Sequence, residues 1–129
     1  MPKPRLSVVI VEDEEVIAEA LQEGLHELLP EYLLKFAWFK DGDDAFRYIH
    51  FASDMIDLLV TDLVHPGMGG EDLVEHVSKH RPETKIVVVS GHGTSYKEKV
   101  KVSPYKIRII QKPCQLRELA EEVKDLLDR

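Results

Sequence analysis

Residues 58–70 read LLVTDLVHPGMGG, and this stretch decides the fold. Its apolar start is typical of a buried strand. The run ends at Asp62, after which Pro66 and a cluster of glycines indicate a loop. From Glu71 onward, polar and apolar residues recur at helical spacing. The stretch therefore predicts a strand, a carboxylate at its C-terminal end, a loop and a helix. Open parallel α/β sheets bind their ligands at that end of the strands.

The same unit recurs along the whole chain. Continuous apolar and β-branched runs, typical of strands buried on both faces, are followed by segments with helical periodicity. The predicted strands are 6–11, 32–39, 58–61, 86–89 and 107–110, and the predicted helices are 14–29, 44–51, 72–79 and 115–127. Residues 94–102 fit either a short helix or an alternating segment. We expect one α/β domain over residues 1–129, a doubly wound sheet of five parallel strands with helices on both faces.

Composition restricts the class of protein. The chain has 129 residues, a formal net charge of -7 and a single cysteine, Cys114. The negative charge repels phosphate backbones, so we expect no direct nucleic-acid partner. No apolar run approaches the roughly 20 residues that a membrane span needs, so we expect none. A lone cysteine fits a reducing compartment, and the cytoplasm is the expected location.

Charged and polar side chains follow four of the predicted strands. They are Glu12 and Asp13 after the first, Asp62 after the third, Ser90 after the fourth and Lys112 after the fifth. Because these strand ends share one edge of the sheet, we expect the side chains to meet in one crevice. Converging carboxylates need a counter-charge, which Mg²⁺ supplies because it prefers oxygen ligands. Asp62 is then a candidate nucleophile toward a phosphoryl group, with Lys112 and Ser90 placed to bind its oxygens.

Together with Pro66, Gly70 and Pro113, these residues resemble the receiver domain of two-component response regulators. Each motif is common alone, but their joint placement at successive strand ends is specific. The resemblance covers essentially the whole chain. It implies the flavodoxin-like strand order 2-1-3-4-5.

The resemblance also implies roles for individual residues. Asp62 corresponds to the phosphoacceptor, Ser90 to the switch hydroxyl and Lys112 to the lysine that contacts the phosphate. The bond between Lys112 and Pro113 corresponds to a cis peptide of the family. The implied Mg²⁺ ligands are Glu12, Asp13, Asp62 and the backbone carbonyl of Val64.

Partners follow from the same resemblance. A histidine kinase or a histidine phosphotransfer protein would donate the phosphoryl group. The new charge would then change the surface formed by residues 91–112, where a downstream protein target would bind, and slow self-hydrolysis would reset it. A basic cluster in and near this surface fits either partner docking or a solvated face; its members are Lys97, Lys99, Lys101, Lys106 and Arg108.

Two alternatives stay open. Ile109 stands where many receivers carry a switch Tyr or Phe, which favours an interaction module that acts independently of phosphorylation. A Mg²⁺-dependent phosphohydrolase is the second alternative, although such enzymes commonly have an acid at the position of Val64. His65 replaces a frequent Met beside Asp62. His65 and His92 flank the crevice, and solvated loop histidines are the simpler interpretation of both. We expect Cys114 to be a buried, inert thiol.

Overall fold

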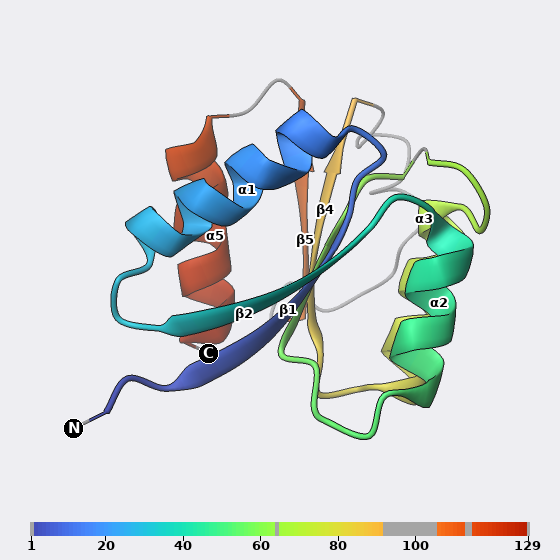
Figure 1. The fold of residues 1–129 in the computed structure, drawn as a ribbon, viewed down its shortest axis with the longest axis horizontal. Helices are drawn as coiled ribbons and strands as arrows, with labels where there is room; N and C mark the ends of the chain where they lie inside the picture. The colour runs from blue at the N-terminus through green and yellow to red at the C-terminus, as the bar shows by residue number, and fades with distance from the viewer. Residues whose placement is uncertain (1, 64, 92–105, 113–114, 129) are drawn as a thin grey trace.

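A computed structural model describes residues 2–63, 65–91, 106–112 and 115–128. Its centre is a sheet of five parallel strands in the order β2-β1-β3-β4-β5, which confirms the predicted order (Figure 1). The strands are β1 (Arg5–Val11), β2 (Leu33–Phe39), β3 (Leu58–Thr61), β4 (Lys85–Ser90) and β5 (Ile107–Gln111). β3 is buried throughout, as its uninterrupted apolar sequence predicts.

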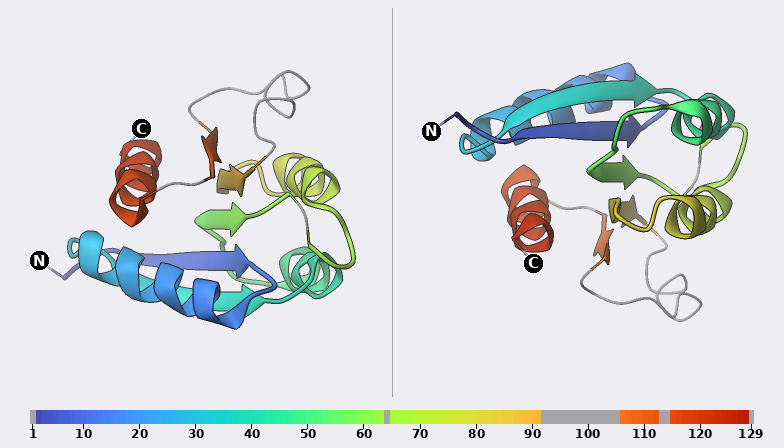
Figure 2. Two further views of the ribbon diagram at one scale, coloured as in Figure 1. Left: turned by 90° about the horizontal axis from the view of Figure 1, so that it is seen from above. Right: turned by 90° about the horizontal axis from the view of Figure 1, so that it is seen from below.

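Helices cover both faces of the sheet. Those in the described ranges are α1 (Glu15–Leu28), α2 (Gly42–Phe51), α3 (Gly70–His80) and α5 (Leu116–Leu127). α1 and α5 lie on one face and α2 and α3 on the other (Figure 2). Each face has its own apolar core, because alternate strand residues point to opposite sides. None of these helices is long and apolar enough to cross a membrane.

The predicted element boundaries differ from the observed ones by at most two residues, and both ends of β3 match. α2 begins at Gly42, two residues before the predicted start, because Asp41 is its N-cap. The Oδ1 atom of Asp41 accepts a hydrogen bond from the backbone N–H of Asp44 at 2.8 Å. α3 extends beyond the predicted 72–79 by two residues at its start and one at its end. The ambiguous segment 94–102 lies outside the described residues.

Strand register gathers the strand ends at one edge. Val11 at the end of β1 pairs with Thr61 at the end of β3, and Thr61 pairs in turn with Val88 of β4. Ser90 at the end of β4 pairs with Gln111 of β5. The residues that follow β1, β3 and β5 therefore leave the sheet together.

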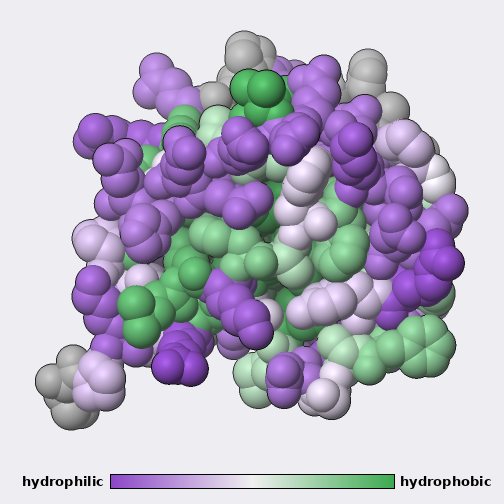
Figure 3. Space-filling model, in the orientation of Figure 1, coloured by the Kyte–Doolittle hydropathy of each residue, from purple (hydrophilic) through white to green (hydrophobic). Residues whose placement is uncertain are grey.

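β2 is an edge strand, and its side is the one that Figure 3 shows. Hydrophobic side chains lie across the middle of this side, and hydrophilic ones lie above them, over α1. Leu33 of β2 is 45% exposed. The exposed Lys35 interrupts this apolar strand, and its positive charge opposes edge-to-edge pairing with another chain.

Candidate functional site

Asp62 follows the last residue of β3 at the carboxyl edge of the sheet. Its Oδ1 atom accepts a hydrogen bond from the backbone N–H of Leu63 at 2.6 Å. Its Oδ2 atom accepts one from Nζ of Lys112 at 2.5 Å. The Asp62 side chain is 18% exposed, so solvent reaches the carboxylate only in part. Both carboxylate oxygens are thus held by donors from separate parts of the chain.

Lys112 reaches this carboxylate from the end of β5. Its backbone N–H donates to the carbonyl of Ser90 at 2.9 Å, which ties the β4 and β5 ends together. Burial alone would lower the pKa of Lys112. The hydrogen bond and charge of Asp62, with the charges of Glu12 and Asp13, outweigh burial and raise that pKa above its ordinary 10.5. The amine is therefore a stable cation facing the acids.

Glu12 lies beside Asp62 and is only 5% exposed. Its Oε2 atom accepts a hydrogen bond from the backbone N–H of Glu14 at 3.0 Å, and its carbonyl accepts one from Nε1 of Trp38 at 2.7 Å. Burial raises the pKa of Glu12 above 4.5, and a hydrogen bond with Asp13 and its charge add to the rise. The raised pKa indicates that the hydrogen bond from Glu14 and the charge of Lys112 offset the cost of burying this carboxylate only in part.

Gly70 allows the loop after β3 to close tightly. A Cβ atom at Gly70 would lie 2.4 Å from the backbone oxygen of Asp62 and 2.5 Å from Cα of Leu63. The N–H of Gly70 donates to the carbonyl of Leu63 at 3.1 Å. Since backbone atoms cannot move aside easily, the start of α3 holds Asp62 in place only with glycine here.

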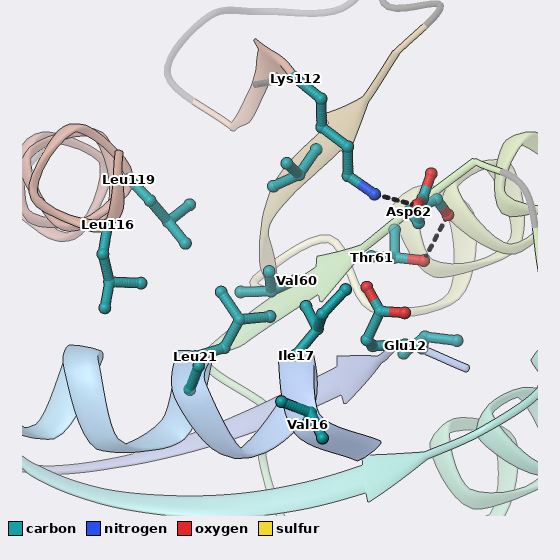
Figure 4. A pocket seen from close by; sticks show the side chains of 13 residues that line it. Glu12, Val16, Ile17, Leu21, Val60, Thr61, Asp62, Lys112, Leu116 and Leu119 are labelled. Atoms are coloured by element: carbon teal, nitrogen blue, oxygen red, sulfur yellow. Dashed lines mark hydrogen bonds and ion pairs between the residues drawn. The ribbon is translucent and has the colours of Figure 1, made fainter. Parts of the chain in front are cut away.

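A cavity of about 630 Å³ opens next to these charges. Figure 4 shows the Lys112 amine pointing at Asp62, with the Glu12 carboxylate turned toward the same point. The remaining walls come from β1, α1, β3, β4 and α5, and most are apolar; they include Val16, Ile17, Leu21, Val60, Leu116 and Leu119. Val16 is 79% exposed and Ile17 is 39% exposed, although both are hydrophobic. The charged edge thus continues into an apolar surface on α1.

The donor set is suited to a hard cation. Glu12 and Asp62 offer carboxylate oxygens, the ligands that Mg²⁺ prefers. A cation beside Glu12 would also relieve the burial that raises its pKa. As the side chains stand, no group of three or more His, Cys, Asp or Glu residues within the described ranges is set to hold a metal ion. Lys112 instead supplies the positive charge that faces Asp62.

The structure brings most of the predicted site residues together. Asp62, Glu12 and Lys112 line one cavity, and Asp13 is exposed but interacts electrostatically with Glu12 and Lys112. Ser90 ends β4 with 1% of its surface exposed. The chemical roles of Glu12, Asp13, Asp62, Ser90 and Lys112 stay predictions. Other predicted features lie outside the described residues: Val64, His92, Pro113, Cys114, three members of the basic cluster (Lys97, Lys99 and Lys101) and most of the 91–112 surface.

Other predicted features have a defined structure. Ile109 is half-buried and packs against the core on the α2 and α3 face. His65 lies with Nε2 3.4 Å from the hydroxyl of Thr61. In the basic cluster, Lys106 donates to the carbonyl of Ser78 at 3.0 Å, and Arg108 forms ion pairs on α5. These two cations are engaged within the chain.

Sequence reasoning missed two features of the site. The first is the hydrogen bond from Nε1 of Trp38 to the carbonyl of Glu12; the half-buried ring itself packs on the α1 and α5 side. A buried indole N–H needs an acceptor, so the single Trp near the C-terminal end of a predicted strand was a usable signal. The second is the apolar wall of α1. Exposed Val16 and Ile17 continue the helical stripe, so periodicity alone could not separate them from the core.

Comparison with known proteins agrees with this geometry. Residues 8–124 match the family model described as the response regulator receiver domain. The sensor kinase CckA of Brucella abortus (strain 2308) is 27% identical over 130 residues, covering 95% of this chain but 13% of that protein. The response regulator receiver protein CpdR of the same organism is 27% identical over 89 residues, covering 69% of this chain and 72% of that protein.

Solved structures show the same fold. The response regulator receiver protein of Sinorhizobium medicae WSM419 has a TM-score of 0.79 and 21% identity, covering 96% of this chain and 95% of that one. The signal receiver domain of an HD domain-containing protein of Pseudomonas fluorescens Pf-5 has a TM-score of 0.77 and 26% identity, covering 96% and 95%. With the family match over residues 8–124, these likenesses show that the chain belongs to the response regulator receiver domains, the signalling domains of two-component systems.

Proposed function

We propose that this domain accepts a phosphoryl group on Asp62 from the phosphohistidine of a histidine kinase or a histidine phosphotransfer protein. The observation that carries the proposal is the 2.5 Å ion pair between Lys112 and Asp62 at the carboxyl edge of the sheet. A carboxylate is ionised at neutral pH, so it attacks without a general base. Its oxygen forms a bond to phosphorus, the bond from phosphorus to the donor imidazole nitrogen breaks, and that nitrogen keeps the electron pair.

Lys112 and Ser90 respond to the new group. The phosphoryl group adds a charge of about -1.5 to -2, which attracts the Lys112 amine. We propose that the Ser90 hydroxyl then turns toward the phosphoryl oxygens and that the surface of residues 91–112 changes with it. A downstream protein target would bind that surface. Slow hydrolysis at Asp62 would return the domain to its starting state.

The metal-binding part of the proposal concerns Mg²⁺. Its proposed ligands are Glu12, Asp13, Asp62 and the backbone carbonyl of Val64. Bound there, Mg²⁺ supplies positive charge that stabilises the transferring phosphoryl group. Support comes from Glu12, a carboxylate that is 5% exposed and whose pKa is raised chiefly by burial, because a bound cation would offset that cost. The predicted compartment of this domain is the cytoplasm.

The apolar wall of α1 supports a protein as the phosphodonor. Exposed hydrophobic side chains beside a reactive carboxylate are typical of a surface that a partner covers. Val16 and Ile17 provide such a surface at the cavity mouth. We therefore propose that the donor protein packs on these two residues while its phosphohistidine reaches Asp62. The change Val16→Lys should slow transfer from the donor protein and leave transfer from a small phosphodonor unchanged.

The central test is a mass measurement. The purified protein is treated with Mg²⁺ and a small-molecule phosphodonor, and its intact mass is determined over time. We expect one added phosphoryl group in the natural protein and none in Asp62→Asn. Asp54→Asn is the matched control, because Asp54 is an exposed aspartate away from the cavity. Equal uptake in Asp62→Asn would refute the assignment of Asp62.

Two other outcomes favour the alternatives. Ile109 in place of the usual aromatic residue motivates a module that binds its partner without phosphorylation. No uptake at Asp62, with partner binding intact in Asp62→Asn, would support that module. Rapid release of phosphate from monoesters, lost in Asp62→Asn, would support a phosphohydrolase instead.

A further inference from the structure

Three histidines meet at the C-terminal ends of α2 and α3. The ring centroids of His76 and His80 are 4.0 Å apart, with the rings stacked at 25°. His50 of α2 lies 5.4 Å from His76 and 6.0 Å from His80 by the same measure. α2 and α3 lie side by side on one face of the sheet (Figures 1 and 2). In a parallel α/β fold the helices run back across the sheet, so these helix ends lie at the edge opposite Asp62.

The surroundings of two ring nitrogens, one in His80 and one in His76, bear on what this cluster can bind. Nδ1 of His80 lies 3.1 Å from the carbonyl of His76. A carbonyl only accepts, so Nδ1 carries the proton and Nε2 of the neutral ring keeps its lone pair. Metal-bound histidines commonly donate their other N–H to a carbonyl in this way. Nε2 of His76 is buried and has no hydrogen-bond partner among the described residues.

An unpartnered buried nitrogen needs an explanation, because burying a polar atom without a hydrogen bond costs free energy. The rings of Phe46, His50 and His80 surround His76 and offer it no acceptor or donor. Burial and the two neighbouring imidazoles also lower the pKa of His76 below 6.5. A lowered pKa favours the neutral ring, which is the form that binds metal.

Spacing favours the same explanation. His76 and His80 are four residues apart, so they lie one turn apart on the same side of α3. Imidazole nitrogens suit Zn²⁺, Cu²⁺ and Ni²⁺, whereas Mg²⁺ and Ca²⁺ prefer oxygen. The cations next to this pair in the sequence are engaged elsewhere: Lys79 pairs with Glu75 at 2.9 Å, and Arg81 donates to three carbonyls.

We propose that His76, His80 and His50 bind one divalent transition-metal ion and so join α3 to α2. In the arrangement described, the rings stack, and the described residues form no ready group of three or more such ligands. Binding therefore requires the rings of His50 and His80 to turn. Both side chains are exposed and can change rotamer, while half-buried His76 stays in place.

The test is a zinc titration of the metal-free protein at pH 7.5, monitored by isothermal titration calorimetry. Excess Mg²⁺ is present throughout to occupy the acids beside Asp62, because Mg²⁺ does not compete for imidazole. We expect one equivalent of Zn²⁺ to bind. Losing a second-shell partner of a metal site costs about 10-fold to 100-fold in affinity. His76→Gln, His80→Gln and His50→Gln, which each remove a ligand, should therefore weaken binding at least tenfold.

His26→Gln is the matched control, since His26 is an exposed histidine in the last turn of α1. It should leave zinc binding unchanged. Zn²⁺ should also raise the melting temperature of the natural protein and not that of His76→Gln, because only folded protein holds the site. Circular dichroism confirms that each variant folds. The proposal fails if no saturable binding occurs, if any of the three histidine variants binds as tightly as the natural protein, or if only Asp13→Asn abolishes binding.

Discussion

Arg81 connects the end of α3 to the end of α2, and we predict that Arg81→Met strongly destabilises the domain. Its guanidinium donates to the carbonyl of Ile49 from Nε at 2.8 Å and to that of Ala52 from one Nη at 2.5 Å. The other Nη donates to the carbonyl of Asp54 at 3.0 Å. The first two carbonyls end α2 and have no acceptor role within the helix, so Arg81 satisfies them.

The magnitude follows from the burial of these bonds. Hydrogen bonds to a charged group contribute about 1.5–3 kcal/mol each. The bond to Asp54 is exposed, and water can replace it, so we count only the two partly buried bonds at the lower value. The expected loss is about 3 kcal/mol of unfolding free energy. At about 4 °C per kcal/mol for a domain of this size, the melting temperature should fall by about 12 °C.

Urea unfolding followed by circular dichroism measures this loss. Arg47→Met is the matched control, because Arg47 is also a hydrogen-bonded arginine, but it and its partner Asp44 have side chains that are 65% and 57% exposed. An exposed pair contributes little, so the control should change stability by less than about 0.5 kcal/mol. If the unfolding free energy of Arg81→Met lies within about 0.5 kcal/mol of that of the natural protein, the three hydrogen bonds do not hold α2 and α3 together, and the prediction is wrong.

Three further predictions concern the site and the histidine cluster. The pKa of His76 is lowered in the folded protein, so the unfolded chain binds the proton first as pH falls below 6.5, and the unfolding free energy declines. His76→Gln should therefore lose less unfolding free energy than the natural protein between pH 7 and pH 5, as measured by urea unfolding. Equal losses in the two proteins would contradict this. Asp13→Asn removes a like charge beside Glu12 and should stabilise the metal-free protein by about 0.5 kcal/mol. The same change should lower phosphoryl uptake, measured from the intact mass. A less stable variant would count against charge repulsion between the two acids. Gly70→Ala places a Cβ 2.4 Å from the backbone of Asp62 and should cost about 1–3 kcal/mol and reduce uptake; natural uptake would show that the loop tolerates the contact.

Much of the fold was predictable because local sequence patterns specify its strands and helices. Mostly apolar runs such as Leu58 to Thr61 are typical of strands buried on both faces, and their alternation with helical segments favours a parallel sheet covered by helices. Once the sheet is parallel, its strand ends share an edge, and Asp62 and Lys112 must approach each other. The start of α2 was predicted two residues too late, although an Asp before a helical segment, here the N-cap Asp41, is a common helix start.

What the sequence by itself determined is therefore the order of elements and the edge at which the acids and the lysine meet. Only the tertiary structure decided that Lys112 takes Oδ2 of Asp62, that Glu12 is buried while Asp13 stays exposed, and that Arg81 and three histidines join α2 to α3. The physical reason is that periodicity reports which side of an element faces the core. Contacts between two helices depend on how they pack and on side-chain rotamers, which no local pattern encodes.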